Sequence, residues 1–217
     1  MFVGHYATAL VLKKYEKRAS LGALFLAVQF VDILFFPLVL LGIERINIVE
    51  NHTQSTHFEL EYMPYTHSLV GSFLWAAAAY VVFRWVVVKQ KSVAMVMALA
   101  VFSHWILDLV VHTPDLPLWS DSSPKLGFGL WHNAIAVYTL EAILLLAATW
   151  IYLKSTTANS KTGQYGMGVF VVFLLLVNLM NVFGPLMDDS KLNIAVSALV
   201  SYFLFAAIAF WLDRKRS

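Results

Sequence analysis

The sequence predicts an all-α integral membrane helical bundle, with about six transmembrane helices and a short N-terminal half-helix. Of its 217 residues, 60% are hydrophobic and 13% are charged, whereas soluble domains carry roughly 25% charged residues. The mean hydropathy of +0.72 points the same way. A transmembrane β-barrel would show segments of about ten residues with alternating hydrophobicity, and the sequence contains none.

Six apolar runs carry the helix prediction, because about 20 consecutive apolar residues are needed for a helix to cross the hydrocarbon core. These runs cover residues 20–43, 66–88, 92–112, 131–153, 167–187 and 192–212. Their close spacing predicts a single membrane domain over residues 1–217. Residues 1–140 of this domain carry the metal site predicted below, and residues 141–217 are expected to be supporting helices.

Residues 1–18 are too short, and too charged at their end, to span a membrane alone. They could lie on the membrane surface as an amphipathic helix. They could also form a half-helix that enters the bundle and turns at residues 17–20. We favour the half-helix, because it brings His5 to the depth of the other polar residues discussed below.

Charged residues between the apolar runs predict the orientation. Basic residues gather before the first run, between the second and third, between the fourth and fifth, and after the sixth. The other loops are acidic or mixed, so the positive-inside rule places both termini in the cytoplasm. The net charge of +2 is not typical of a nucleic-acid-binding protein, and we expect membrane lipids, not nucleic acid, as partners. The absence of cysteine excludes disulfides and thiolate metal sites.

Several ionisable residues lie inside the apolar runs, where they are costly and usually mark function. His104, Asp108 and His112 recur at four-residue steps and therefore form one stripe on a helix. At ~1.5 Å per residue, the buried candidates all fall about 20 to 33 Å above the inner face. They are His5, Asp32, His67, His104, Asp108, His112 and His132.

Neutral imidazole and carboxylate are ligands for zinc and related divalent metals. One four-coordinate ion needs about four ligands, so seven candidates suggest two ions with an open position each, most simply Zn²⁺. Glu141 lies nine residues after His132, about 180° around a helix. If His132 faces the site, Glu141 points away from it and is expected to make a structural contact.

The ordered set of motifs resembles a known family. It comprises Gly4-His5, Asp32, Pro64-Tyr-Thr-His67-Ser68, His104-x-x-x-Asp108-x-x-x-His112 followed by Pro114-Asp115, and Trp131-His132-Asn133. It is similar to the bacterial inner-membrane metal-dependent hydrolases, which look distantly related to zinc-dependent phospholipases C and zinc single-strand nucleases. The resemblance covers roughly residues 1–140. Ala136 stands where those distant relatives have a glutamate, which favours one or two metals over three.

The resemblance implies an enzyme of the bacterial inner membrane with its site toward the outer side. Its expected substrate is a phosphoester of a lipid or lipid-like molecule. Metal-activated water would be the nucleophile. Asp108 would bridge or ligate the metals, Asp32 would ligate or act as general base, and Asp115 would assist from the loop over residues 113–130.

Two other functions fit the same residues. Intramembrane Asp and His chains are typical of proton relays, so the chain could be a small proton or metal-ion transporter, although the repeated halves common in transporters are not evident. The polar groups could also simply hold the helices together. Outside the apolar runs, the polar stretch 44–65 is interpreted as an external solvated loop. The glycine-rich stretch 163–168 lacks the preceding strand that a phosphate-binding loop needs.

Overall fold

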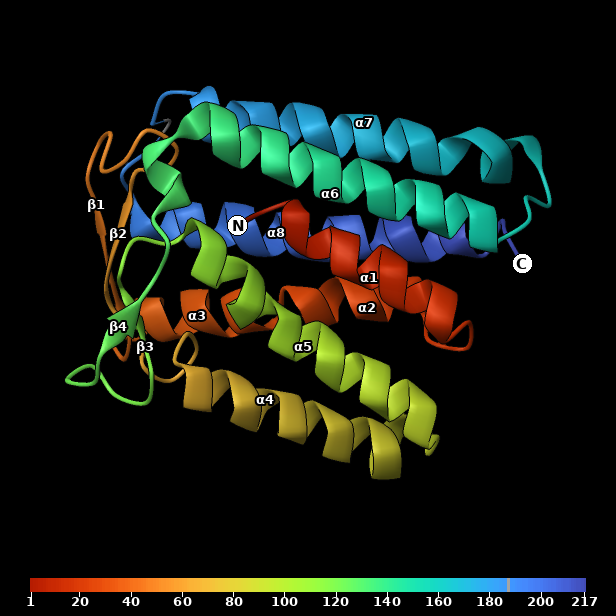
Figure 1. The fold of residues 1–217 in the computed structure, drawn as a ribbon, viewed down its shortest axis with the longest axis horizontal. Helices are drawn as coiled ribbons and strands as arrows, with labels where there is room; N and C mark the ends of the chain where they lie inside the picture. The colour runs from red at the N-terminus through yellow and green to blue at the C-terminus, as the bar shows by residue number, and fades with distance from the viewer. Residues whose placement is uncertain (187) are drawn as a thin grey trace.

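The computed structural model describes residues 1–186 and 188–217 and shows a helical bundle with a small β-region at one end (Figure 1). The α-helices are α1 (Gly4–Tyr15), α2 (Leu21–Val28), α3 (Phe30–Leu40), α4 (Leu69–Val82), α5 (Lys91–Val111), α6 (Ala134–Ser155), α7 (Lys161–Phe183) and α8 (Lys191–Asp213). A π-helical turn (Phe83–Val87) extends α4, and a 3₁₀ turn (Leu130–His132) precedes α6. This architecture confirms the predicted all-α bundle.

Five helices in the described part of the chain are long and apolar enough to cross a membrane: α4 with its π-turn, α5, α6, α7 and α8. The pair α2 and α3 makes a sixth if it is counted as one span, although it bends by 50°. The bend lies at Gln29, whose side-chain amide donates to the carbonyl of Phe2. The six apolar runs of the sequence therefore correspond to six helical segments, one of them broken.

Polar caps explain where several of these helices begin. A side-chain oxygen at the residue before the helix accepts a backbone N–H from the first turn, which satisfies one of the donors left unpaired there. The capping residues are Ser20 for α2, Ser68 for α4, Asn133 for α6, Ser160 for α7 and Ser190 for α8. Each cap lies just before an apolar run, so the sequence specifies these boundaries locally.

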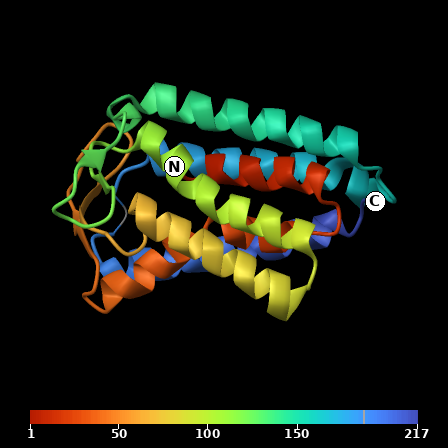
Figure 2. The same ribbon diagram turned by 60° about the horizontal axis from the view of Figure 1, so that its bottom comes forward.

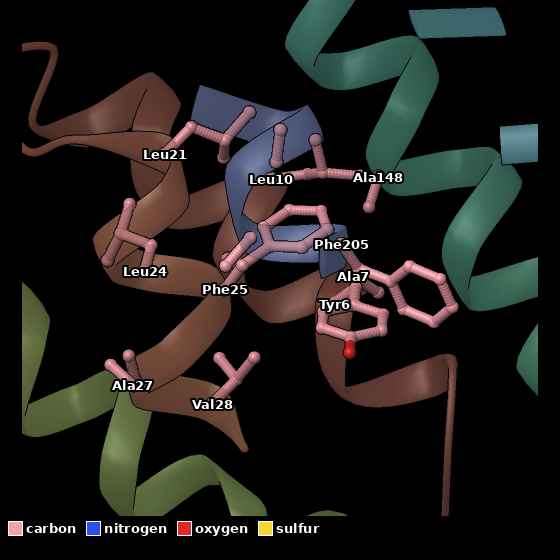
Figure 3. Close-up of a cluster of buried hydrophobic side chains, with 14 of the residues drawn as sticks. Tyr6, Ala7, Leu10, Leu21, Leu24, Phe25, Ala27, Val28, Ala148 and Phe205 are labelled. Carbon is pink, nitrogen blue, oxygen red and sulfur yellow. The ribbon is translucent and has the colours of Figure 1, made fainter. Parts of the chain in front are cut away.

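The N-terminal helix α1 lies inside the bundle, as the half-helix interpretation predicted. It packs against α6, α2 and α5 (Figures 1 and 2). Tyr6 and Leu10 of α1 are buried with Leu24 and Phe25 of α2 and Phe205 of α8 (Figure 3). The Tyr6 and Phe25 rings stack with their centroids 4.5 Å apart. This apolar core fixes the position of α1 in the bundle, and with it the position of His5.

The stretch predicted to be a solvated loop instead contains an antiparallel hairpin, β1 (Arg45–Ile48) with β2 (Phe58–Tyr62). Its apolar residues alternate with polar ones, which places Ile46 in a buried cluster with Phe35. A second short pair, β3 (Leu116–Pro117) with β4 (Lys125–Leu126), lies at the same end of the bundle (Figure 1). The two hairpins cover the end at which α3 and α5 finish.

The opposite end of the bundle carries the basic residues, and polar side chains link its helices there. Lys13 Nζ lies 2.7 Å from Asp213 Oδ2, and the Tyr152 hydroxyl donates to Asp213 Oδ1 at 2.9 Å. At this end α7 approaches α8 closely: a Cβ atom on Gly163 would collide with the backbone oxygen of Lys215. The glycine-rich stretch at the start of α7 therefore serves helix packing.

Candidate metal centre

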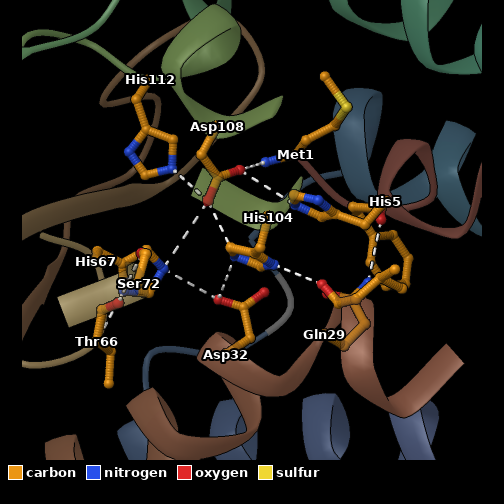
Figure 4. A network of polar contacts seen from close by, with 12 residues as sticks. Met1, His5, Gln29, Asp32, Thr66, His67, Ser72, His104, Asp108 and His112 are labelled. Carbon is orange, nitrogen blue, oxygen red and sulfur yellow. Dashed lines mark hydrogen bonds and ion pairs between the residues drawn. The ribbon is translucent and has the colours of Figure 1, made fainter. Parts of the chain in front are cut away.

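Six of the seven predicted ligands converge at the hairpin end of the bundle (Figure 4). They come from five segments: His5 from α1, Asp32 from α3, His67 from just before α4, His104 and Asp108 from α5, and His112 from the residue that ends α5. All except Asp32 are buried, and the Asp32 side chain is 18% exposed. Helices far apart in the sequence thus supply one polar cluster, which we call the His/Asp cluster.

One half of the His/Asp cluster lies around Asp108 Oδ2 and Asp32 Oδ1. Asp108 Oδ2 is 3.0 Å from His104 Nε2, and it is 3.5 Å and 4.0 Å from Nε2 of His112 and His67. Asp32 Oδ1 is 3.3 Å from His67 Nε2 and 3.6 Å from His104 Nε2. Neighbouring ligands of a tetrahedral zinc ion lie about 3.3 Å apart, given bonds near 2.0–2.1 Å. The ligand atoms of Asp32, His67 and His104 therefore have the spacing of a metal-ligand set, and Asp108 lies beside His104 at its edge.

The other half lies around Asp108 Oδ1. The Met1 amine is 2.7 Å from this oxygen, and His5 Nε2 is 3.2 Å from it. The His5 and His104 rings stack in parallel, with centroids 3.9 Å apart and 5° between their planes. Two positively charged imidazolium rings would repel each other in this arrangement, so the stacking favours neutral rings.

His104 and His112 are both oriented by an acceptor behind the ring. His104 Nδ1 lies 2.7 Å from the carbonyl oxygen of Val28, and His112 Nδ1 lies 2.8 Å from Oδ1 of Asp115. A carbonyl and a carboxylate can only accept, so Nδ1 must carry the hydrogen in both rings. In the neutral imidazole, Nε2 then presents its lone pair to the carboxylates of the cluster.

His67 is oriented through a longer relay. Its Nδ1 is 2.7 Å from the hydroxyl of Thr66, which donates its own hydrogen to Glu44 Oε2 at 2.6 Å. Glu44 is fully buried and its Oε1 accepts the backbone N–H groups of Tyr65 and Thr66. Because the hydroxyl hydrogen is taken, Thr66 accepts from His67, and Nε2 of this ring also faces the cluster with a lone pair. Ligand histidines in metalloproteins are commonly held in this way.

Two groups in the described residues offer ligand atoms within 4.8 Å of one another: His5, His104 and Asp108, and Asp32, His67 and His104. The two groups share His104. Asp108 of the first group also lies 4.0 Å from His67 of the second. The His/Asp cluster can therefore hold a divalent metal ion, as the sequence predicted.

Two residues outside the predicted set also contact the cluster region. The Tyr202 hydroxyl of α8 donates to Asp32 Oδ2 at 3.2 Å. Glu141 of α6, which is buried, accepts the backbone N–H groups of Phe2 and Gly4 at 3.0 and 2.8 Å. The helices expected to be purely supporting thus contribute a contact to a predicted ligand.

A cavity of 520 Å³ opens onto the His/Asp cluster. Asp32, His67, Asp108 and His112 line its floor. Its walls combine hydroxyl, amide and carboxylate groups with apolar side chains, which include Phe35, Phe36, Ile46, Phe58, Leu60, Ile194 and Ala198. No lysine or arginine lines it within residues 1–186 and 188–217. A concave site whose walls combine apolar side chains with polar groups is typical of a small-molecule site.

The structure does not bring His132 to the cluster. Gly129 adopts the left-handed region at φ 73°, and the 3₁₀ turn that follows directs Trp131 onto His112, with ring centroids 4.0 Å apart. His132 is exposed on the outer surface of this turn.

Glu141, expected to make a structural contact, accepts the backbone N–H groups of Phe2 and Gly4 and also lines the cavity. Because His132 faces away from the cluster, the half-turn offset directs Glu141 inward.

Asp115, predicted as a catalytic residue, lies behind the His112 ring and accepts from Thr113 as well. It does not line the cavity. Asp115 is therefore positioned to orient the His112 ring, not to face a substrate in the cavity.

No protein-family model, curated protein or solved structure matches this chain.

Proposed function

We propose that this chain is a membrane-embedded, metal-dependent hydrolase that cleaves a phosphoester of a lipid or lipid-like substrate. One observation carries the proposal: three imidazole rings with Nδ1–H fixed by acceptors present Nε2 to the carboxylates of Asp32 and Asp108. A lone pair facing a carboxylate oxygen at this distance is repulsive unless a metal ion or a proton lies between them. One divalent ion would balance both carboxylates while every ring stays neutral.

The proposed ligands are His67, His104, Asp32 and Asp108, with His112 beside Asp108. His5 and Asp108 are the candidates for a second ion. Zinc suits this set, because imidazole and carboxylate are among its usual ligands. A bound divalent ion supplies Lewis acidity and a water of lowered pKa.

The residues of the cavity support a phosphoester substrate that depends on the metal. A phosphate group in an apolar environment needs positive charge nearby. The described lining residues contain no lysine or arginine, so the ion is the natural partner of the phosphate. Asp32, the more exposed of the two carboxylates, would either ligate the ion or accept a proton from water as a general base.

The apolar core between the cluster and the basic end favours hydrolysis over transport. Leu21, Leu24 and Phe25 are almost completely buried on the basic side of Val28, which contacts His104. A proton or ion path through the bundle would need polar groups or water at this depth. With both termini in the cytoplasm, the proposed orientation places the His/Asp cluster toward the outer side of a bacterial inner membrane.

The test is hydrolysis by protein purified in detergent, stripped of metal with a chelator and then given zinc. Products from mixed phospholipid vesicles and from small soluble phosphoesters are followed by ³¹P NMR. We expect cleavage that needs added metal, falls more than 100-fold in Asp108→Asn and persists in His132→Ala. Absence of cleavage across a broad panel of phosphoesters, with metal bound, would contradict the proposal.

A further inference from the structure

The helices α7 and α8 contact each other at the basic end and separate toward the hairpin end (Figures 1 and 2). At the basic end, Gly163 and Gly166 leave room only for the backbone of Lys215 and the side chain of Leu212. Farther along, Phe173 packs edge-on against Phe205, with ring centroids 6.0 Å apart. Phe205 lies about one helical turn closer to the basic end than Ser201 and Tyr202, the cavity-lining residues of α8 nearest to it.

Beyond Phe205, the facing sides of α7 and α8 line the cavity. Val177 and Asn181 contribute from α7, and Ser197 and Ser201 contribute from α8. Asn181 and Ser197 are exposed, and neither makes a side-chain hydrogen bond among the described residues. The cavity therefore extends to exposed positions on both helices.

The other helix pairs around the cavity are packed at this level. Tyr138 of α6 packs edge-on against Phe183 of α7 and donates to the carbonyl of Leu175. Phe35 of α3 belongs to the same buried cluster as Ala195 and Tyr202 of α8. Side chains thus connect α6 to α7 and α3 to α8 at this level.

We propose that the cavity opens sideways into the membrane between α7 and α8, and that a phospholipid enters there with its phosphate directed to the His/Asp cluster. Both helices are candidate membrane spans, so lipid is the molecule that faces this opening. Hydroxyl and amide groups on lipid-facing positions are unfavourable without a partner. The polar head of an entering lipid would supply one.

The cavity face of α8 fits a molecule with a polar head and an apolar chain. Asn193, Ser197 and Ser201 recur at four-residue steps and form a polar stripe, while Ile194 and Ala198 form an apolar stripe beside it. The polar stripe ends next to Tyr202, which contacts Asp32. From Asn193 to Tyr202 the rise is about 14 Å. A head group can thus follow polar groups from the membrane to the cluster.

This inference rests on the proposed lipid substrate, but its test does not require hydrolysis. Because the chain has no cysteine, a single Ser201→Cys variant can carry a small fluorophore at the opening. The protein is placed in vesicles of phosphatidylglycerol and phosphatidylethanolamine with brominated acyl chains, which quench by contact. Val200→Cys, on the exposed face of α8, is the matched lipid-facing control.

We expect the label at Ser201 to be quenched by brominated lipid to a degree comparable with Val200. Adding Asn181→Trp, which fills the opening from α7, should remove most of the quenching at Ser201 and leave Val200 unchanged. Ser197→Cys repeats the measurement if the Ser201 variant does not fold. Quenching of the label by aqueous iodide but not by lipid would mean a water-filled cavity closed to the membrane, which overturns the proposal.

The hydrolase and the opening can fail separately. Lipid quenching at Ser201 in a protein that binds metal but cleaves no phosphoester would support the opening and contradict the hydrolase. Phospholipid cleavage without lipid quenching at Ser197 or Ser201 would support the hydrolase and contradict entry between α7 and α8.

Discussion

Tyr202 donates its hydroxyl hydrogen to Asp32 Oδ2 at 3.2 Å, although 170 residues separate the two in sequence. The contact leaves Asp32 Oδ1 to face His67 and His104. It therefore fixes which oxygen of Asp32 is presented to the candidate metal. It also ties α8, the last helix, to a cluster whose predicted ligands all lie in the first 140 residues.

Replacing Tyr202 by phenylalanine removes this hydrogen bond and keeps the ring. Residues that orient a metal ligand typically contribute about 10–100-fold to metal affinity, so we expect Tyr202→Phe to weaken zinc binding by that factor. Competition with a fluorescent zinc chelator measures the change. Tyr138→Phe, which loses a hydroxyl contact to the Leu175 carbonyl, is the control and should bind zinc normally.

Asp115→Asn tests whether this carboxylate orients His112. Asparagine can still accept from Nδ1 through its amide oxygen, but it lacks the negative charge that makes the His112 ring a stronger ligand. Zinc affinity should fall about 10–100-fold while the fold is retained. Asp121→Asn, in the same loop and paired only with Lys125 at 2.8 Å, should leave the affinity unchanged. Equal effects of the two variants would mean that the loop as a whole, not the contact with His112, is responsible.

Breaking the relay from Glu44 through Thr66 to His67 should lower both the stability of the protein and its affinity for zinc. Thr66→Val preserves the shape but leaves the buried groups of Glu44 and His67 without a partner, at a cost of about 1–3 kcal/mol. Thr149→Val is a matched control, because the Thr149 hydroxyl is also buried but bonds only the Leu145 carbonyl of its own helix. Chemical unfolding in detergent should separate the two variants, and similar losses in both would rule out a special role for the relay.

Two glycines of α7 predict opposite effects of the same substitution. A Cβ at Gly163 would collide with the Lys215 backbone, so Gly163→Ala should destabilise the protein by about 1–3 kcal/mol. A Cβ at Gly168 meets no atom within 4 Å, so Gly168→Ala should be neutral or stabilise the helix by up to about 1 kcal/mol. Thermal unfolding followed by circular dichroism tests the pair, and a stable Gly163→Ala variant would contradict the close approach of α7 to α8.

The bundle was predictable from the sequence because each span is a long apolar run, and the depth of the ligands followed from helical rise. His5 is a clear example: only insertion of residues 1–18 brings it level with His104, and the two rings stack. The hairpin over β1 and β2 was missed, although the alternation in Phe58-Glu-Leu-Glu-Tyr62 is typical of a strand. The acidic residues Glu59 and Glu61 are exposed, and they alone favour a solvated loop, whereas the apolar residues that alternate with them form the half-buried face of the strand.

His132 was predicted as a ligand but does not reach the cluster, whereas Tyr202 contacts a predicted ligand and was not predicted. Depth places His132 near the cluster, but the direction of its side chain depends on the turn after Gly129, which helical periodicity cannot describe. Tyr202 carried a weak signal, since Asn193, Ser197 and Ser201 mark a polar stripe on an otherwise apolar helix. The sequence carries no signal for Glu44, because tertiary packing brings it to Thr66, which in turn contacts His67.

The most direct test of the central claim is the metal content of the purified protein. Inductively coupled plasma mass spectrometry is applied to the wild type, to Asp32→Asn as the ligand variant and to His132→Ala as the histidine control. We predict one or two zinc-like ions per chain in the wild type and in His132→Ala, and a loss in Asp32→Asn. A folded wild type that contains no metal and does not retain added zinc would contradict the account, and would leave His67, His104 and His112 as protonated partners of the two carboxylates.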